Sequence, residues 1–196
     1  MSLTINGLPF SGVVKEATQE NHQETEKLLL PRLNNIKSKQ DYAAILRMFY
    51  GYFFPLENII QASITPLQLP DIAERRNADT ILRDLASIDE AASGIMLCEN
   101  LPAISSAAQA FGALYVMEGS TLGGKIIARM LVKNGAFPVP EDALHFFSGY
   151  RDDTGPKWKA FLEALNKQTA IEEITTSANE TFFYLKSWMQ HSFSNE

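Results

Sequence analysis

The stretch that decides the fold is Val13-Val14-Lys15-Glu16-Ala17-Thr18-Gln19-Glu20-Asn21-His22-Gln23-Glu24-Thr25-Glu26-Lys27-Leu28-Leu29. Its apolar residues recur at the spacing of a helix, and neither glycine nor proline interrupts it. Ser11 stands where an N-cap is expected, and Pro31 follows shortly after the last apolar residue. The pattern therefore predicts one long helix that Ser11 opens and Pro31 closes.

His22 is the residue of this helix whose side chain is best suited to a chemical role. Four residues lie on its face at a period of 3.6, and most are apolar or small: Val14, Thr18, Thr25 and Leu29. We therefore expect the imidazole to point into the protein. Such a histidine is either a core residue satisfied by a neighbour or a metal ligand, and the helix alone leaves both interpretations open.

Lys15 and Glu26 extend the metal-ligand interpretation. Glu26 follows His22 by one helical turn, where a carboxylate can orient an imidazole as its outer partner. Lys15 precedes His22 by two turns, about 10 Å along the helix axis, and offers a cation to a bound anion. A cation at that distance from an iron ligand suits a haem propionate.

The composition limits the classes of protein that fit. With 196 residues, of which 45% are hydrophobic, the chain is expected to form one domain, residues 1–196, with flexible ends at 1–10 and 194–196. The net charge of −6 and the lack of a basic run argue against nucleic acid and anionic membrane as partners. The single cysteine, Cys98, fits a reducing compartment, and no apolar run is long enough to span a membrane. We expect a cytoplasmic protein.

Helical spacing continues through most of the chain, and no stretch alternates as a strand would. Further helices are predicted over 39–63, 71–88, 141–147, 157–167 and 171–193, with a connection over 89–102. Pro55 is expected to kink the first of these. Its aromatic face fits either a core or a cofactor wall. The second is expected to carry Arg75, Arg76 and Asp84 on a solvated side. The fold class is all-α, with about seven or eight helices.

A second informative stretch is Tyr115-Val116-Met117-Glu118-Gly119-Ser120-Thr121-Leu122-Gly123-Gly124. Its flanks, 107–117 and 126–133, are good helix, yet its three glycines cost a helix about 3 kcal/mol relative to alanine. The glycines indicate either close packing at a helix joint or a backbone that lies against a flat ligand. The spacing does not match a phosphate-binding loop, and no strand precedes it.

Together, the two stretches resemble the haem oxygenase family, the biliverdin-producing enzymes, in its bacterial branch. Lys15-Glu16-Ala17-Thr18-x-x-x-His22-x-x-x-Glu26 is similar to the family's proximal helix, and the glycine-containing stretch is similar to its kinked distal helix. Phe146-Phe147-x-x-Tyr150 and Gly155-Pro156-x-Trp158-x-x-Phe161 also match bacterial members. The resemblance covers residues 12–190. It implies a single-domain fold that holds haem between these two helices.

The resemblance also implies roles for individual residues. His22 would be the axial ligand of haem iron, Glu26 the partner of its other ring nitrogen, and Lys15 and Tyr115 the anchors of the propionates. The remaining residues implied at the site are Gly119, Ser120, Gly123 and Gly124 across the distal face, Phe182 as a pocket aromatic and Lys159 as a second cation. Of these, Gly119, Ser120 and Gly123 would act in catalysis. Ser120 stands where animal members carry an aspartate.

The implied reaction opens haem to biliverdin and releases carbon monoxide and ferrous iron. It needs oxygen and an external electron donor of the ferredoxin or reductase type, because the chain has no flavin or nicotinamide fingerprint. Three alternatives stay open. A haem carrier or sensor would use the same fold, a di-iron protein would use Asp142-x-x-His145, and a thiaminase-like hydrolase would use Cys98. A structural role suits Cys98 better, since no acid–base partner lies near it in sequence.

Overall fold

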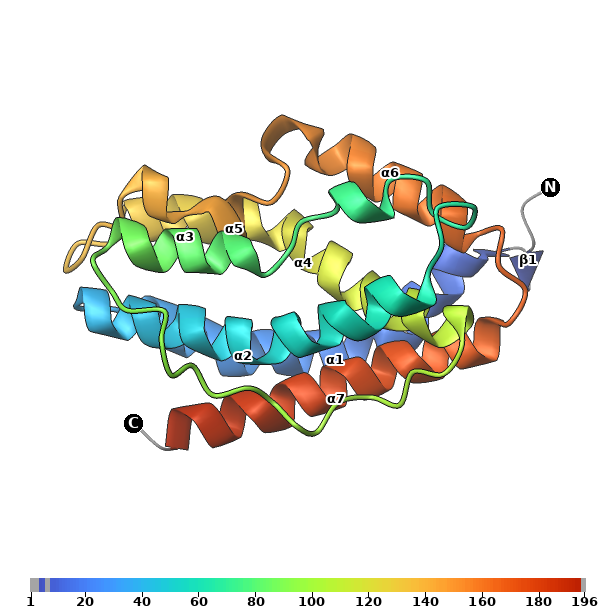
Figure 1. Ribbon diagram of the computed structural model, residues 1–196, viewed down its shortest axis with the longest axis horizontal. Helices are drawn as coiled ribbons and strands as arrows, with labels where there is room; N and C mark the ends of the chain where they lie inside the picture. The colour runs from blue at the N-terminus through green and yellow to red at the C-terminus, as the bar shows by residue number, and fades with distance from the viewer. Residues whose placement is uncertain (1–3, 6–7, 195–196) are drawn as a thin grey trace.

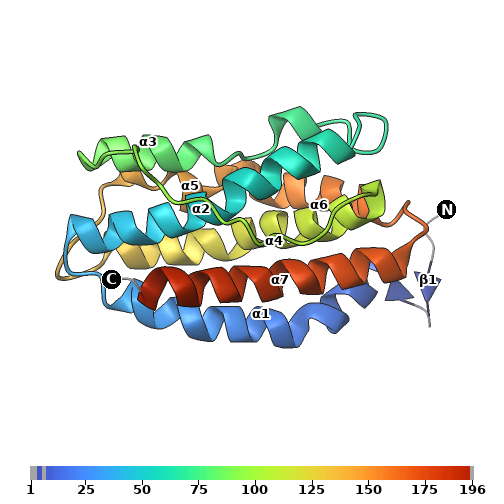
Figure 2. The same ribbon diagram turned by 60° about the horizontal axis from the view of Figure 1, so that its bottom comes forward.

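The protein is all-helical, as predicted. This computed structural model describes residues 4–5 and 8–194. Its α-helices are α1 (Phe10–Asn34), α2 (Lys39–Ser63), α3 (Asp79–Ser87), α4 (Ala107–Val132), α5 (His145–Ser148), α6 (Thr154–Leu165) and α7 (Ile171–Ser194). Three short 3₁₀ turns join them: η1 (Ile72–Glu74), η2 (Glu141–Ala143) and η3 (Arg151–Asp153). Helices α1, α4 and α7 run in the same direction along the long axis, and α2 runs in the opposite direction (Figures 1 and 2). None of these described helices is long and apolar enough to cross a bilayer.

The predicted flexible ends fall partly on residues 1–3, 6–7 and 195–196, which lie outside the described residues. Near the N-terminus, β1 (Thr4–Ile5) pairs antiparallel with β2 (Leu8–Pro9), in the register Thr4 to Pro9 and Ile5 to Leu8. The sequence did not predict this pair, because two-residue strands are too short to show alternation.

Capping boxes fix the starts of the two helices at the centre of the fold. Ser38 caps α2 by accepting the Asp41 N–H, and the Asp41 carboxylate accepts the Ser38 N–H in return. Ser106 and Gln109 make the same reciprocal pair at the start of α4. Each box satisfies two backbone donors that a helix start leaves unpaired, so neighbouring residues determine where each of these helices begins.

The predicted bounds of the first helix are wrong at both ends. Ser11 is inside α1, and its N–H donates to the Asn166 side chain at 2.8 Å. Asn166, at the end of α6, therefore satisfies the Ser11 N–H, whereas the sequence predicted a cap formed by residues next to the helix start. Pro31 is also inside the helix, which continues to Asn34. Pro31 removes one backbone donor from the helix, and Asn35 closes the end by donating to the Pro31 carbonyl.

The predicted helix over 71–88 is broken into η1 and α3. Arg75 leaves the helical conformation between them, with a ψ of 150°. The prediction that its charges face solvent is wrong for Arg75 and Asp84, which are 6% and 0% exposed. Both are paired with residues far away in sequence: Arg75 with Glu118, and Asp84 with His145. Partners so far apart along the chain leave no periodic pattern in the sequence from which the pairing could be predicted.

The aromatic face of α2 belongs to the core. Tyr42, Tyr52 and Phe53 are at most 2% exposed, and Phe49 packs on Phe146 and Phe147 of α5. The two tyrosine hydroxyls donate to backbone carbonyls at 2.7 Å, so no buried polar group is left unpaired there. Of the two interpretations of this face, the structure supports a core.

Helix α4 continues through its glycines instead of dividing into two flanking helices. The side of α4 that contains Gly112 lies directly against α7, where a Cβ atom would overlap the Ile174 carbonyl and come within 2.9 Å of the Ser177 Cβ. α4 is thereby the central helix, with α7 on one side and α5 and α6 on others (Figures 1 and 2).

Candidate active site

His22 lies at the rim of the buried face of α1. Val14 and Thr18 are at most 2% exposed, whereas the His22 side chain is 56% exposed. The expectation that the imidazole points into the protein is therefore wrong for this structure. Its angular position is offset from Thr18 by about 40° around the helix, which is enough to bring it to the edge of the buried stripe. One edge of the ring is covered, because Phe182 of α7 meets it in a T-shaped contact at 5.9 Å between centroids.

Glu26 lies beside His22 but does not hold it firmly. The His22 Nδ1 and Glu26 Oε2 atoms are 3.8 Å apart, and both side chains are 56% exposed. That separation is longer than a hydrogen bond, so the contact is a loose electrostatic one. It does place the carboxylate on the Nδ1 side of the ring and leaves Nε2 clear of it.

Tyr115 of α4 meets α1 one turn after Lys15, at Thr18. The Thr18 side chain, one turn after Lys15, interacts with the Tyr115 phenol, which is also packed on Trp158 at 5.5 Å. Burial raises the pKa of Tyr115, and the Thr18 contact offsets part of the rise. Lys15 is exposed and forms no ion pair with any described residue. The Tyr115 phenol thus lies beside the turn of α1 that begins with Lys15.

Gly119 and Gly123 leave one face of α4 open. A Cβ atom at Gly123 would meet nothing within 4 Å, and one at Gly119 would meet only the Trp158 ring at 3.8 Å. Two exposed apolar side chains share this face, Leu122 at 43% and Ile126 at 71%. A bare helix backbone flanked by exposed apolar groups is a surface that a flat apolar molecule can contact closely.

Ser120 is exposed at the edge of this face. Its hydroxyl donates to the Met117 carbonyl at 2.6 Å and accepts from the Arg76 guanidinium at 2.8 Å. The hydroxyl proton is therefore held by the helix itself, while one lone pair on the oxygen stays available to a water or ligand.

Gly124 does not belong to the open face, and its predicted role there is wrong. It is buried against α5, where a Cβ atom would overlap the Phe147 carbonyl oxygen and lie 3.1 Å from its carbon. Gly123 and Gly124 are adjacent, so they lie about 100° apart around the helix and face different neighbours. Close packing therefore explains Gly124, whereas Gly119 and Gly123 leave the other side of α4 open.

A buried polar network supports α4 from behind, and the sequence did not reveal it. Arg75 donates to Glu118 at 2.8 Å and to Asp71 at 2.8 Å, and Tyr150 donates to the other Glu118 oxygen at 2.8 Å. Burial alone would raise the pKa of Asp71, but hydrogen bonds from Lys157 and Arg75 outweigh it and lower that pKa below 3.8. The network fixes the turn of α4 that contains Glu118.

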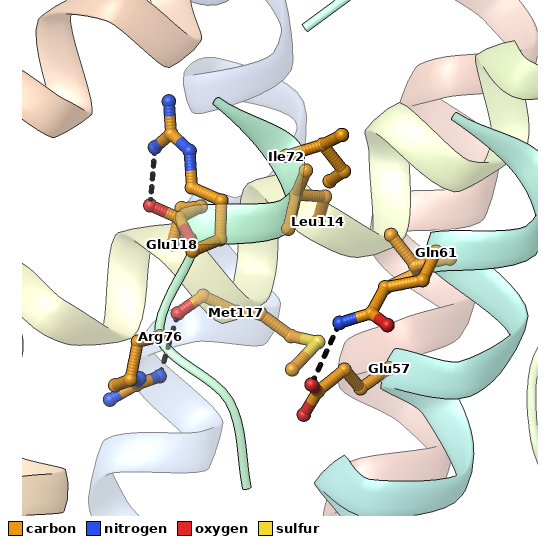
Figure 3. A pocket seen from close by; sticks show the side chains of 9 residues that line it. Glu57, Gln61, Ile72, Arg76, Leu114, Met117 and Glu118 are labelled. Atoms are coloured by element: carbon orange, nitrogen blue, oxygen red, sulfur yellow. Dashed lines mark hydrogen bonds and ion pairs between the residues drawn. The ribbon is translucent and has the colours of Figure 1, made fainter. Parts of the chain in front are cut away.

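A small cavity lies beside this network, between α2, η1 and α4 (Figure 3). Its volume of about 10 Å³ is room for one water molecule. Glu57 lines it, held by the Gln61 side chain at 2.9 Å and the Ala78 N–H at 2.7 Å. Burial raises the pKa of Glu57. Arg75, Arg76 and Glu118 line the same cavity, together with apolar side chains such as Leu114 and Met117.

Other candidates from the sequence lie elsewhere. The Lys159 side chain is 80% exposed and lies 4.0 Å from Glu163, so the structure gives it no contact with the site. Cys98 is buried and its thiol lies 3.3 Å from the Asn100 carbonyl, as a structural thiol would. His145 is held by Asp84 at 2.8 Å, and residues 4–5 and 8–194 contain no group of three His, Cys, Asp or Glu that could hold a metal ion. Neither the di-iron nor the thiol alternative gains support.

The site thus has two walls, the side of α1 that contains His22 and the open face of α4, and the two helices meet where Thr18 contacts Tyr115. Among the described residues, no hydrogen bond, ion pair or ring contact joins His22 to residues 119–124. Their donor set fits haem: one accessible imidazole for iron, an unpaired cation and a phenol for carboxylates, and a backbone surface without side chains for the ring.

Comparison with known proteins shows the family of the chain. Residues 8–191 match the family model described as heme oxygenase. A heme oxygenase of Xanthomonas campestris pv. campestris (strain 8004) is 31% identical over 127 residues, which cover 65% of this chain and 73% of that protein. The NO- and CO-bound heme oxygenase of Neisseria meningitidis shares the fold, with a TM-score of 0.77 and 22% identity over 96% of this chain and 94% of that one. The chain belongs to the haem oxygenase family, the enzymes that open haem to biliverdin, carbon monoxide and ferrous iron.

Proposed function

We propose that this chain binds haem between α1 and α4, with His22 as the iron ligand, and opens the ring to biliverdin. The observation that carries the assignment is the pairing of an accessible imidazole on α1 with the open face of α4. Gly119 and Gly123 form that face, and the two helices meet at the contact between Thr18 and Tyr115. No other described histidine lies on either wall.

His22 coordinates through Nε2, because its Nδ1 is turned toward Glu26. The Glu26 carboxylate then favours a proton on Nδ1 and so keeps Nε2 free to bind a metal. Phe182 restricts rotation of the ring through its edge contact at 5.9 Å. The ligand would bind iron as a neutral imidazole, as histidine ligands do.

Lys15 and Tyr115 bind the propionates. A charge-assisted hydrogen bond of this kind is worth about 1.5–3 kcal/mol, and exposure of Lys15 reduces that value. Tyr115 is the better positioned of the two, since Trp158 and Thr18 restrict its ring. Together they fix the rotation of the substrate in its plane, which decides the ring edge that is attacked.

The open face of α4 would cover the bound haem and limit access of water to it. With no side chain at Gly119 or Gly123, the backbone contacts the ring directly and leaves little room for bulk water. Ser120 accepts a hydrogen bond from Arg76 and donates to Met117, so it offers an acceptor rather than a free proton. The haem iron supplies the oxygen chemistry, and the protein supplies orientation and exclusion of water. Electrons come from an external donor of the ferredoxin or reductase type, and a reducing cytoplasm would suit this partner and the lone Cys98.

The test is the absorption spectrum of the protein titrated with haemin, followed by addition of a reducing system. Wild type should show a histidine-ligated spectrum and form biliverdin, and His22→Ala should lose both. His145→Ala is the matched control, because that histidine is held by Asp84 away from either wall. Biliverdin formation by His22→Ala at the wild-type rate would refute the assignment.

A further inference from the structure

Arg76 is a charged group that reaches the active-site wall from behind. It lies after η1, outside every segment in which the sequence placed site residues. Its Nη2 donates to the Ser120 hydroxyl at 2.8 Å and to the Met117 carbonyl at 3.1 Å. The guanidinium therefore lies directly behind an exposed oxygen of the wall, in the turn that precedes Gly123.

The guanidinium is held from several sides. Its Nη1 donates to the Phe146 carbonyl at 3.1 Å, and its carbon lies 4.5 Å from the centroid of the Phe146 ring and 5.8 Å from that of Phe53. The Arg76 N–H donates to the Tyr150 hydroxyl at 2.7 Å, which fixes the backbone as well. A side chain with contacts to α2, α4 and α5 loses little further freedom when a ligand arrives, so its charge is preorganised.

This positive charge is not cancelled by an ion pair. Arg75, its neighbour in sequence, forms ion pairs with Asp71 and Glu118, whereas no described carboxylate lies within ion-pair distance of Arg76. Its hydrogen bonds go to two carbonyls and a hydroxyl. The charged or titratable groups that act on it are Glu118 on α4, Glu57 on α2 and Tyr150. Glu118 is already engaged by Arg75 and Tyr150.

We propose that Arg76 is the positioning cation of the distal wall. It fixes the Ser120 oxygen and the Met117 carbonyl, and its charge, which no described ion pair neutralises, would favour anions over neutral ligands at the haem iron. The proposal rests on the function proposed above, since it places haem against this wall. The physical basis is that a fixed charge in a partly desolvated site is screened less than one in water.

Azide is the probe, and carbon monoxide is the neutral reference ligand. We expect Arg76→Gln to weaken azide binding to the ferric haem complex about tenfold and to change the affinity of the ferrous complex for carbon monoxide less than twofold. Arg76→Lys should recover most of the azide affinity, because it restores the charge. Arg83→Gln is the matched control: it removes an exposed charge of the same type on α3 and should leave both affinities unchanged.

A second variant, which is expected to change azide affinity in the opposite direction, keeps the test decisive if Arg76→Gln does not fold. Glu57→Gln removes a negative charge that faces Arg76 across the small cavity (Figure 3), so it should tighten azide binding about threefold. A parallel loss of azide and carbon monoxide affinity in Arg76→Gln, without recovery in Arg76→Lys, would overturn the proposal. Unchanged azide binding in the Glu57 variant would do the same.

Failure of the proposed function would appear earlier and in a different signal. If His22 does not ligate the iron, the spectrum of His22→Ala matches wild type before azide is added. If the Arg76 proposal alone is wrong, all Arg76 variants keep the histidine-ligated spectrum and only the azide result differs from expectation.

Discussion

Alanine substitutions at Gly123 and Gly124 test whether these neighbouring glycines have separate roles. Both variants gain the same helix propensity, about 0.8–1 kcal/mol. At Gly123 the new methyl group enters open space, so the variant should be more stable than wild type by about that amount. At Gly124 the methyl group would overlap the Phe147 carbonyl oxygen and lie 3.1 Å from the carbonyl carbon, so α5 must move.

The difference between the two variants isolates the cost of that movement, because the propensity gains cancel. Overpacking of this kind costs about 1–3 kcal/mol, and backbone atoms relax less easily than side chains. For a protein of this size the difference corresponds to roughly 2–12 °C in Tm, with Gly124→Ala the lower. The measurement is thermal and urea unfolding of the haem-free proteins, followed by circular dichroism.

Haem titration then separates the open face from the packed face. Gly123→Val should fold with stability near that of wild type, yet lose at least tenfold in haem affinity, since its branched side chain stands where the ring would contact the backbone. Equal stability of Gly123→Ala and Gly124→Ala would refute the close packing of α5. Haem binding by Gly123→Val with wild-type affinity would refute the assignment of the open face.

The remaining predictions concern the anchors and acid stability. Lys15→Ala should raise the haem dissociation constant about threefold to tenfold and change the ratio of biliverdin isomers, whereas unchanged values would remove Lys15 from the site. Tyr115→Phe should alter the isomer ratio in the same direction, measured by chromatography of the product. Asp71 has a lowered pKa in the folded protein, so its stabilising contribution is present above its unfolded value of 3.8 and is lost as the pH falls through the folded value. Asp71→Asn should therefore be less stable than wild type at pH 7, and the gap in urea midpoint should shrink below about pH 3.8; a constant gap would contradict this.

The sequence by itself determined the helical class and which residues share a face of a helix. Regular apolar spacing fixes which residues share a helix face, so it placed Lys15, Thr18 and His22 on one side of α1. The same local rule brought Gly119 and Gly123 to one face of α4. These features are local, because they depend only on residues within two turns of one another.

The tertiary structure decided what each face meets. Gly123 and Gly124 are equivalent in sequence, yet only the position of α5 makes one open and the other packed. The exposure of His22 depends on how far Phe182 of α7 covers its ring.

The partners and burial of the charged residues were the features that the sequence predicted least well. Arg75 and Arg76 are adjacent, and a helical pattern predicted both as solvated. Arg75 forms an ion pair with Glu118, whereas Arg76 forms none with a described carboxylate and donates to Ser120. Glu118 and Ser120 lie more than forty residues away along the chain, and the energy of a charge depends on the distance and burial of its partner in space, which spacing along the sequence does not encode.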